Sequence, residues 1–476
     1  MNVLDDIRDF AREQPRQPAV ISGSRGEAPD EIVDYETLVA RFDQRAQWLR
    51  EAGVERGQRC GLVARQGCGF IEAALAILAT DACFVHIPDG TDGAALDQAA
   101  RESSLHHLLE EDSGFELQSF SGVAPVDGQE DRAFRALRPA YLRFTSGTTS
   151  ERKGVIVGHD AVAARLANAN QTLKIDPEDR VMWLLPMAHH FLVSILLYLR
   201  NGATVLLPPS NFAADVLDFA NRHSATVFYA SPYHYGLLAK DESELGLGAA
   251  RLAISTADGL REEDAERFKL RFGKPLVQAL GIIEVGLPVI NVASAAVKPE
   301  ALGRVGEAYD IWLREEEGSR IDPEASSPTS TGEICIRGSG LFDAYLKPWI
   351  LAAELLEPDG FRTGDQGWFD TEGDLHLAGR RSNRINMAGM KFFAEEVEAV
   401  LDAHPGIEAS RVFAKEHPHL GQIPVAEFVA SDGGESLDRR MLAAHCKQRL
   451  PPYKIPREFK PVAALALTET GKLKRN

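Results

Sequence analysis

Short apolar stretches alternate with helical patterns along the first three-quarters of this 476-residue chain, and this alternation most constrains its fold. The segment 35–51 has helical spacing, with its apolar residues along one stripe. Apolar runs of strand length lie between helical segments, at 83–87, 181–185, 204–207 and 226–229. Alternating strands and helices favour parallel sheets covered by helices, so we expect an α/β fold.

Further segments extend the same pattern. Apolar residues predict a helix over 71–79, and Asp160 is a suitable N-cap for a helix that runs to about Gln171. Gly273 ends another predicted helix, and the strand 275–280 follows it. These segments place helices and strands in regular succession up to about residue 300.

The pattern changes beyond residue 300. Short strands punctuated by Gly and Asp, typical of hairpins, are predicted at 333–337, 360–363 and 374–378. A polar stretch over 379–383 lacks core residues, and a helix over 394–403 follows it. A chain of this length needs more than one core. We therefore predict a large domain over 1–378, a hinge over 379–383 and a small α+β domain over 384–476.

Composition excludes several classes of protein. The net charge of −18 disfavours non-specific binding to nucleic acid. The acidic N-terminus lacks a signal pattern, and the longest apolar stretch, 184–199, is too short to span a bilayer. Five scattered cysteines have no paired ligand spacing, which argues against structural zinc. We expect a cytoplasmic protein with no stable membrane association and no nucleic-acid partner; the sequence does not indicate its oligomeric state.

A hydroxyl-rich segment, Thr-Ser-Gly-Thr-Thr-Ser-Glu-Arg-Lys-Gly over 145–154, is suited to holding polyphosphate. Anionic oxygens need convergent N–H and hydroxyl donors and a point charge, which Lys153 supplies. The alternative is an ordinary polar hairpin loop, because Gly, Ser and Thr also favour turns. The candidate phosphate-binding residues are Thr145, Ser146, Gly147, Thr148, Thr149 and Lys153.

Two acidic residues stand at positions suited to nucleotide chemistry. Glu284 follows a predicted buried strand, at the end where ligands bind in open α/β sheets. A phosphate-bound Mg²⁺ needs only one or two protein carboxylates, so Glu284 is either a metal ligand or a surface loop residue. Asp365 lies in a predicted tight turn and is suited to accepting hydrogen bonds from ribose hydroxyls. Its alternative is a β-turn in which Asp365 caps its own backbone.

These segments, in this order, resemble the adenylate-forming superfamily of acyl- and aryl-CoA synthetases along nearly the whole chain. The resemblance rests on the 145–154 loop, Leu-Gly-Ile-Ile-Glu over 280–284, and Gly-Glu-Ile-Cys-Ile-Arg-Gly over 332–338. It continues with Arg-Thr-Gly-Asp over 362–365, Gly-Arg-Arg-Ser-Asn over 379–383, Leu-Pro-Pro-Tyr-Lys-Ile-Pro over 450–456, and Thr-Glu-Thr-Gly-Lys over 468–472. It implies helix-covered sheets with a small β-barrel-like part and a mobile C-terminal domain.

The resemblance implies a two-step reaction with ATP and Mg²⁺. A carboxylate attacks the α-phosphate, giving an acyl-adenylate and pyrophosphate, and a thiol then displaces AMP. Lys472 would contact the carboxylate and α-phosphate, Asp365 and Arg380 would hold the ribose, and Glu284 would bind Mg²⁺. The small domain would then rotate, which withdraws Lys472 and brings Gly389 to the thiol tunnel. Gly281 and Asp258 match segments that line the adenine and acyl sites.

Several positions depart from the family pattern. Leu280 replaces the usual aromatic residue beside adenine, and Ile283 replaces a hydroxyl residue near the α-phosphate. Asn383 stands where the hinge usually has Asp or Lys. These three changes motivate a different interpretation, a non-catalytic adenylate-binding regulatory protein. The four family residues Lys153, Glu284, Asp365 and Lys472 argue against it.

The acid substrate and the thiol acceptor stay open. The segment Pro-Met-Ala-His-His-Phe over 186–191 resembles one side of the acid pocket, so His189 is either a pocket gate or a hydrogen-bonded core residue. His190 and Leu280 would also line the pocket, and Tyr233 would either wall it or pack elsewhere. We expect an aromatic or medium-chain acid.

CoA is the expected acceptor, with the phosphopantetheine of a separate acyl carrier protein as the alternative. Residues 379–476 carry a net charge of +4 and the remainder −22, so an acidic carrier would be tolerated only by the C-terminal part. Chance variation among solvated residues explains the same asymmetry.

Overall fold

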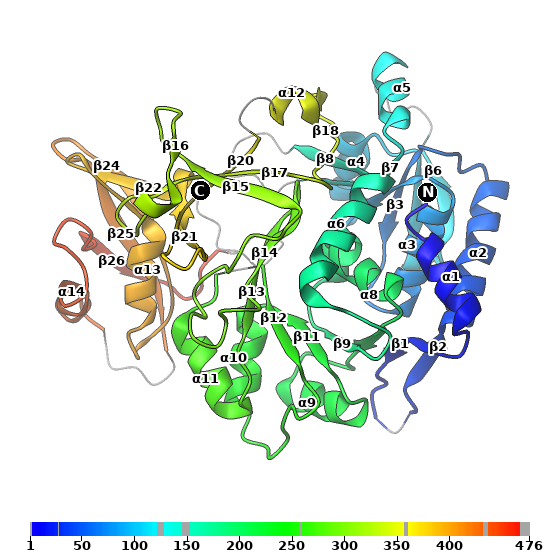
Figure 1. The fold of residues 1–476 in the computed structure, drawn as a ribbon, viewed down its shortest axis with the longest axis horizontal. Coiled ribbons are helices and arrows are strands. Elements are labelled where there is room, and N and C mark those ends of the chain that lie inside the picture. Colours follow the sequence, from blue (N-terminus) through cyan, green and yellow to red (C-terminus); the bar gives the residue numbers. More distant parts are fainter. Residues whose placement is uncertain are drawn as a thin grey trace.

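A computed structural model describes residues 2–26, 28–120, 128–144, 153–257, 259–356, 360–431 and 437–466. Within these residues the strands form four sheets (Figure 1). One is mostly parallel, a second has a parallel centre flanked by antiparallel strands, and the other two are mostly antiparallel; helices cover the first two. The α/β class expected from the sequence is confirmed.

The first sheet runs in the order β14-β13-β12-β11-β9-β10-β1-β2. Its inner strands are parallel, and the edge strands β2 and β14 are antiparallel to their neighbours. The strands are β1 (Pro18–Ser22), β2 (Glu31–Asp34), β9 (Arg180–Trp183), β10 (Thr204–Leu207), β11 (Val227–Ala230), β12 (Leu252–Ser255), β13 (Val277–Ile282) and β14 (Gly286–Ile290). The connecting helices are α9 (Ala213–Arg222), α10 (Pro232–Lys240) and α11 (Glu262–Phe272).

The second sheet runs in the order β19-β18-β8-β7-β4-β3-β5-β6, and its parallel centre is β7-β4-β3-β5. The strands are β3 (Arg59–Val63), β4 (Cys83–His86), β5 (His107–Glu110), β6 (Glu116–Ser119), β7 (Pro139–Phe144), β8 (Gly154–Gly158), β18 (Ala344–Tyr345) and β19 (Ile350–Leu351). The helices are α1 (Asp5–Glu13), α2 (Tyr35–Glu51), α3 (Cys68–Ala79), α4 (Gly93–Ser103), α5 (Gly128–Ala136), α6 (His159–Leu173), α7 (Met187–His190), α8 (Leu196–Arg200) and α12 (Ala352–Leu356). Short 3₁₀ and π turns are η1 (Glu111–Ser113) and η2 (Phe191–Ile195).

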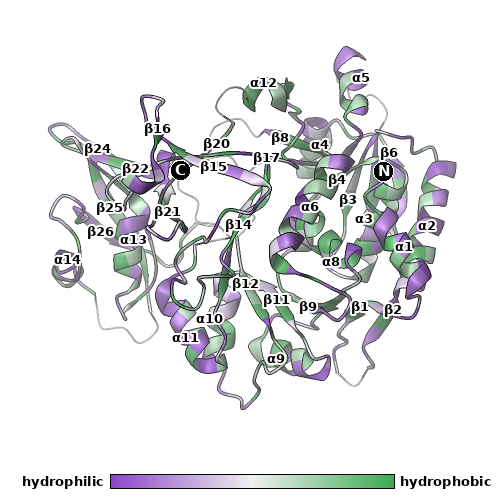
Figure 2. Ribbon diagram, in the orientation of Figure 1, coloured by the Kyte–Doolittle hydropathy of each residue, from purple (hydrophilic) through white to green (hydrophobic). Residues whose placement is uncertain are grey.

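One core cluster joins the two large sheets. Helix α3 is buried almost all round, as expected for a helix inside a large core. The same cluster includes side chains of β4, β7, β9 and β11. Figure 2 shows hydrophobic colouring on the inner strands and hydrophilic colouring on outer turns of helices such as α1. Apolar burial between the sheets therefore fixes their relative position.

The two remaining sheets complete the fold toward the C-terminus. The third runs β16-β15-β17-β20-β21, and the fourth runs β23-β22-β25-β24 with β26 beside β25. Their strands are β15 (Tyr309–Arg314), β16 (Arg320–Ile321), β17 (Gly332–Gly338), β20 (Phe361–Phe369), β21 (Leu375–Arg380), β22 (Arg384–Met387), β23 (Met390–Phe393), β24 (Ile407–His417), β25 (Gly421–Ala430) and β26 (Glu458–Pro461). The remaining helices are α13 (Ala394–Asp402), α14 (Arg439–Lys447) and the 3₁₀ turns η3 (Pro323–Ala325) and η4 (Arg381–Asn383).

Two expectations about local structure need correction. Asp160 is not an N-cap, because α6 begins at His159, with Gly158, two residues earlier, at the cap and Asp160 in the first turn. Asp365 lies within strand β20 beside a register shift, rather than in a turn between strands. The predicted hinge, 379–383, contains the last two residues of β21, Gly379 and Arg380, and the turn η4.

The domain boundaries 1–378, 379–383 and 384–476 stay a prediction. Among the described residues, every helix is too short or too polar to cross a bilayer.

Candidate active site

Glu284, Tyr345 and Lys153 meet at the edge of the two large sheets. Strand β18 pairs with β8 so that Tyr345 is opposite Val155, two residues after Lys153. The Tyr345 hydroxyl donates a hydrogen bond of 3.0 Å to Glu284 Oε1, and the Lys153 ammonium lies 4.9 Å from the Tyr345 ring centroid. Tyr345 therefore contacts a carboxylate through its hydroxyl and an ammonium through its ring. This arrangement suits cation–phosphate chemistry.

The Glu284 side chain is only 8% exposed, so the surface-loop interpretation is wrong. Burial raises the pKa of Glu284, while the Tyr345 hydroxyl and the charges of Arg165 and Lys153 favour its ionised form. A buried carboxylate with cationic neighbours is a common property of functional sites.

Arg165 fixes the turn that carries Glu284, and sequence reasoning missed it. Its guanidinium donates to the carbonyl oxygens of Gly340, Ile283 and Glu284, at 2.9, 3.0 and 3.4 Å. Burial lowers the pKa of Arg165 to about 10. Gly340 has φ +81°, and a Cβ there would lie 2.7 Å from the backbone nitrogen of Arg165. The sequence signal for this role was Arg165 itself, a charged residue on the apolar stripe of the helix predicted between Asp160 and Gln171.

Asp365 and Arg380 lie directly opposite each other on β20 and β21. Arg380 Nε donates to Asp365 Oδ1 at 3.0 Å, and the Asp365 side chain is only 7% exposed. Gly364 has φ +76°, which favours glycine at this irregular point of the strand. The Asp365 amide donates to Thr363 Oγ1. Thr363 therefore caps the backbone of Asp365, whereas the turn predicted from the sequence had the Asp365 side chain cap the backbone.

His189 and His190 lie on α7, whose chain continues into the π-helical turn η2, a conformation frequent at functional sites. The His190 ring packs edge-on against Trp183 and Tyr229 at the carboxyl ends of β9 and β11. The His189 ring packs edge-on against His86, and Nδ1 of His189 has no hydrogen-bond partner among the described residues. Burial, followed by the charge of Arg143, lowers the pKa of His189 to about 4, so its imidazole is neutral at pH 7.

The other predicted pocket residues lie in different environments. Tyr233 is 70% exposed, so the interpretation that it is packed in a core is wrong. Leu280 is half-buried against the core of the third sheet, and Ile283 is half-buried against the main core. Gly281 is exposed, and a Cβ there would lie 3.5 Å from Thr256 Oγ1. Gly281 therefore presents an exposed backbone without a side chain, which a flat ring system can approach.

The predicted hinge and thiol residues lie near the fourth sheet. Asn383 Nδ2 donates to Glu395 Oε1 at 2.5 Å. Gly389 has φ +85° in the tight turn between β22 and β23. Lys391 of the same hairpin pairs with Glu316, which follows β15 of the third sheet. In this conformation the hinge residue is therefore hydrogen-bonded to Glu395, and the hairpin is paired with Glu316.

Seven predicted site residues lie outside the described part of the chain: Thr145, Ser146, Gly147, Thr148, Thr149, Asp258 and Lys472. Where residues are described, no group of three or more His, Cys, Asp or Glu side chains forms a metal site. Glu284 provides a buried, ionisable oxygen donor, and this fits an octahedral Mg²⁺ whose other ligands are phosphates and water.

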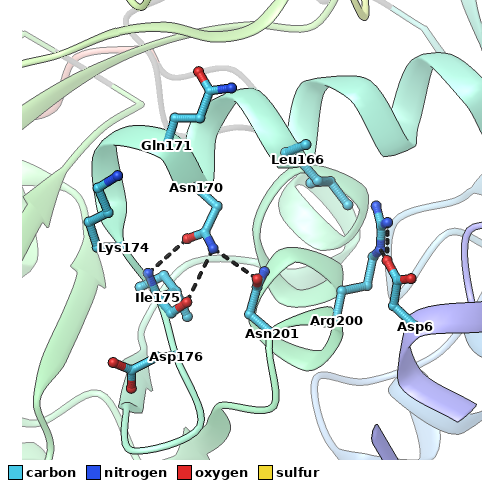
Figure 3. A pocket seen from close by; sticks show the side chains of 10 residues that line it. Asp6, Leu166, Asn170, Gln171, Lys174, Ile175, Asp176, Arg200 and Asn201 are labelled. Atoms are coloured by element: carbon cyan, nitrogen blue, oxygen red, sulfur yellow. Dashed lines mark hydrogen bonds and ion pairs between the residues drawn. The ribbon is translucent and has the colours of Figure 1, made fainter. Parts of the chain in front are cut away.

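A surface pocket of about 590 Å³ lies apart from these residues, at the C-terminal end of α6 (Figure 3). Asn170 there binds the Ile175 carbonyl and Asn201, and Arg200 pairs with Asp6. The pocket includes no predicted site residue, and its polar groups are largely paired with one another.

Comparisons with known proteins agree on one family. Residues 7–346 match the model of the AMP-binding enzyme family, and residues 396–472 match the model of its C-terminal domain. The chain is 28% identical to a sulfoacetate–CoA ligase of Cupriavidus necator over 71% of this chain and 66% of that protein. It is 28% identical to 4-coumarate–CoA ligase 1 of Oryza sativa subsp. japonica over 76% of this chain and 66% of that protein.

The solved structure of the anthranilate CoA ligase AuaEII, in complex with anthranoyl-AMP, has the same fold. Its TM-score is 0.83, with 20% identity and coverage of 99% of this chain and 95% of that chain. At this identity the likeness concerns the fold alone. The first curated relatives are matched over 66% of their own length, slightly under two thirds.

Proposed function

Because the chain belongs to the AMP-binding enzyme family, we propose that it joins a carboxylic acid to a thiol at the expense of ATP. The acid is aromatic or of medium chain length, and the thiol is CoA. The observation that carries this proposal is the contact of Glu284 with Tyr345, beside Lys153 at the start of β8. This contact brings a buried carboxylate close to a cation that belongs to the 145–154 segment, whose sequence suits polyphosphate.

In the first step the acid carboxylate attacks the α-phosphorus of ATP. A new oxygen–phosphorus bond forms, the bond to the bridging oxygen breaks, and pyrophosphate leaves with the electron pair. Lys153 and the 145–154 segment hold the pyrophosphate, and Lys472 contacts the carboxylate and the α-phosphate. Glu284 would hold a magnesium ion, which would supply charge neutralisation at the phosphates. The protein contributes positioning and electrostatic stabilisation rather than its own nucleophile.

Asp365 and Arg380 bind the ribose. The Asp365 carboxylate accepts hydrogen bonds from the two ribose hydroxyls, and Arg380 orients that carboxylate by donating to Oδ1. Gly281 and Asp258 lie on the adenine side, where Leu280 takes the place of an aromatic ring. The nucleotide is therefore held chiefly by its ribose and phosphates.

In the second step a thiol sulfur attacks the acyl carbon and AMP leaves. The C-terminal part rotates about Asn383, which withdraws Lys472 and brings the Gly389 hairpin toward the thiol. Release of the pairs Asn383–Glu395 and Lys391–Glu316 accompanies this rotation. The basic C-terminal part supports a carrier-protein phosphopantetheine as the second candidate acceptor.

We place the activity in the cytoplasm. All five cysteines are buried and none forms a disulfide, which suits a reducing compartment.

Acid-dependent exchange of pyrophosphate into ATP tests the first step over a panel of acids. Exchange with at least one acid is expected, and its absence with every acid contradicts adenylation. Addition of CoA or a holo carrier protein, followed by mass measurement of the thioester, decides the acceptor.

The Lys472→Ala variant tests the rotation. It should suppress exchange far more than thioester formation from supplied acyl-adenylate, because Lys472 acts only in the first step. Equal losses in the two steps contradict the rotation.

A further inference from the structure

Three polar residues, Arg143, His86 and His189, form a cluster inside an otherwise aromatic contact. Strands β4 and β7 are parallel neighbours, with Phe84 opposite Tyr141 and Val85 opposite Leu142. The same register places His86 opposite Arg143. Because strand side chains alternate between faces, His86 and Arg143 lie on the face of Phe84 and Tyr141, at the carboxyl ends of both strands.

Helix α7 and the turn η2 cover this face. The His189 ring packs edge-on against His86, with 4.7 Å between centroids, and Arg143 Nη1 donates to the His189 carbonyl at 2.7 Å. Two residues after His189, the Phe191 ring centroid lies 6.0 Å from that of Phe84. The Phe84 ring in turn stacks on Tyr141. The Arg143–His86–His189 cluster is therefore enclosed by three elements and bordered by aromatic rings.

The cluster contains buried polar atoms without a partner. Both ring nitrogens of His86 and Nδ1 of His189 are buried, and none has a hydrogen-bond partner among the residues that the structure describes. Burial, assisted by the neighbouring imidazole and Arg143, lowers the pKa of His86 well below its usual range. Two neutral imidazoles each offer one N–H donor and one acceptor nitrogen. Native proteins rarely leave such atoms unpaired, so they mark a place where a ligand completes the bonding.

The cluster stands where a ligand of this fold is expected. Ligands of open α/β sheets bind beyond the carboxyl ends of the strands, and Arg143 is two residues before Thr145. His190, next along α7, covers the corresponding ends of β9 and β11. A guanidinium and two imidazoles among aromatic rings match an oxygen substituent on an apolar skeleton, since a plain hydrocarbon would leave them unpaired.

We propose that the Arg143–His86–His189 cluster binds a second oxygen group of the acid, a hydroxyl or a carboxylate remote from the carboxylate that reacts with ATP. This inference rests on the proposed function and names its substrate class, an oxygen-substituted aromatic or medium-chain acid. The aromatic rings of Phe84, Tyr141 and Phe191 hold the carbon skeleton, and the cluster selects the substituent.

The test compares matched acids in pyrophosphate exchange with the full-length protein. Benzoate, 3- and 4-hydroxybenzoate and the corresponding dicarboxylates form one series, and hexanoate, 6-hydroxyhexanoate and adipate form another. We expect at least one oxygenated acid to exceed its parent in kcat/KM by about 100-fold or more, because a site built to hydrogen-bond rejects an analogue that lacks the group. A hydroxyl preferred over a carboxylate, or the reverse, identifies the substituent.

The variants His86→Phe and Arg143→Met should reduce that preference at least tenfold, with Arg143→Met acting more strongly on dicarboxylates. His159→Phe is the matched control, because His159 is also buried with its pKa lowered to about 4 but belongs to α6. It should leave the ratio unchanged. His86→Gln provides a polar replacement if His86→Phe does not fold.

A preference for unsubstituted acids in the wild type, or an equal loss on all acids in the variants, overturns the inference. Calorimetric binding of the same acids separates it from the proposed function. Selective binding that His86→Phe abolishes, in the absence of pyrophosphate exchange, supports the subsite and contradicts adenylation. Pyrophosphate exchange without selectivity among the acids supports adenylation and contradicts the subsite.

Discussion

Glu284 follows the buried strand β13 and His86 ends the buried strand β4, and the two residues differ in how their polar atoms are paired. Glu284 accepts a hydrogen bond from Tyr345, and Arg165 holds the backbone that carries it. The His86 ring has no such partner among the described residues. The first site is organised before any ligand arrives, as electrostatic catalysis requires. The second has polar atoms that only a ligand or water can satisfy.

The largest effect is expected for Glu284→Gln. The amide oxygen still accepts the Tyr345 hydrogen bond, but the negative charge is lost. Pyrophosphate exchange should fall by about 100- to 1000-fold, the range typical of a lost electrostatic contact. The melting temperature should stay equal or rise, because a charge is no longer buried. Unchanged exchange would mean that Glu284 does not act at the phosphates.

Arg165→Met tests whether the organised site depends on its support. Three backbone carbonyl oxygens lose a donor in a buried position, so the free energy of unfolding should fall by about 3 kcal/mol. Urea denaturation measures this loss. Arg12→Met, at a side chain that is 74% exposed, is the control and should change stability by less than about 0.5 kcal/mol. Similar values for the two variants would contradict the supporting role.

Tyr345→Phe removes one hydroxyl and leaves the ring beneath Lys153. The hydrogen bond to a carboxylate contributes about 1.5 kcal/mol, so exchange should fall by about tenfold. The cation–π contact is retained. A loss as large as that of Glu284→Gln would mean that the hydroxyl has a direct role in the reaction.

His86→Phe should have the smallest effect on stability and a sign opposite to Arg165→Met. Replacing unpaired polar atoms by a ring of similar size is expected to be neutral or to stabilise by about 1 kcal/mol. Denaturation at pH 7 measures the change. Destabilisation by more than about 2 kcal/mol would indicate a partner that already satisfies the imidazole.

The pH dependence gives a second measurement on the same variant. The pKa of His189 is lowered from its usual 6.5 to about 4 in the folded protein, and that of His86 is also lowered. Between these values the unfolded chain binds more protons, so stability rises with pH across this window and is lost as pH falls. His86→Phe should make the slope shallower. An unchanged slope would mean that His86 does not titrate on unfolding.

Local patterns allowed most elements to be predicted. The helix over 35–51 and the strand over 204–207 were predicted with correct bounds, since both have clear apolar periodicity and a polar start. The N-terminus of α6 was misplaced by two residues because Gly158 takes the cap position that the sequence indicated for Asp160.

The site was only partly predictable. Lys153, Glu284, Asp365 and Arg380 stood out because they belong to contiguous motifs. Tyr345 and Arg165 did not, because their roles depend on the pairing of β18 with β8 and on the packing of α6 against the β13–β14 turn. His86 lay inside a correctly predicted strand, but nothing local indicated that His189 would pack on it. For Tyr233 the sequence left two alternatives open, because the exposure of a single aromatic residue depends on distant segments.

The pairing of Tyr345 with Val155 also has a consequence for synthesis of the protein. The segment that precedes β8 leaves the ribosome early, whereas β18 is translated only after β9 to β17. A nascent chain can therefore build its first parallel strands without an assembled catalytic edge. Under the proposed function, an incomplete chain released before Tyr345 would fold in part but would lack the Glu284–Tyr345 contact and would not consume nucleotide.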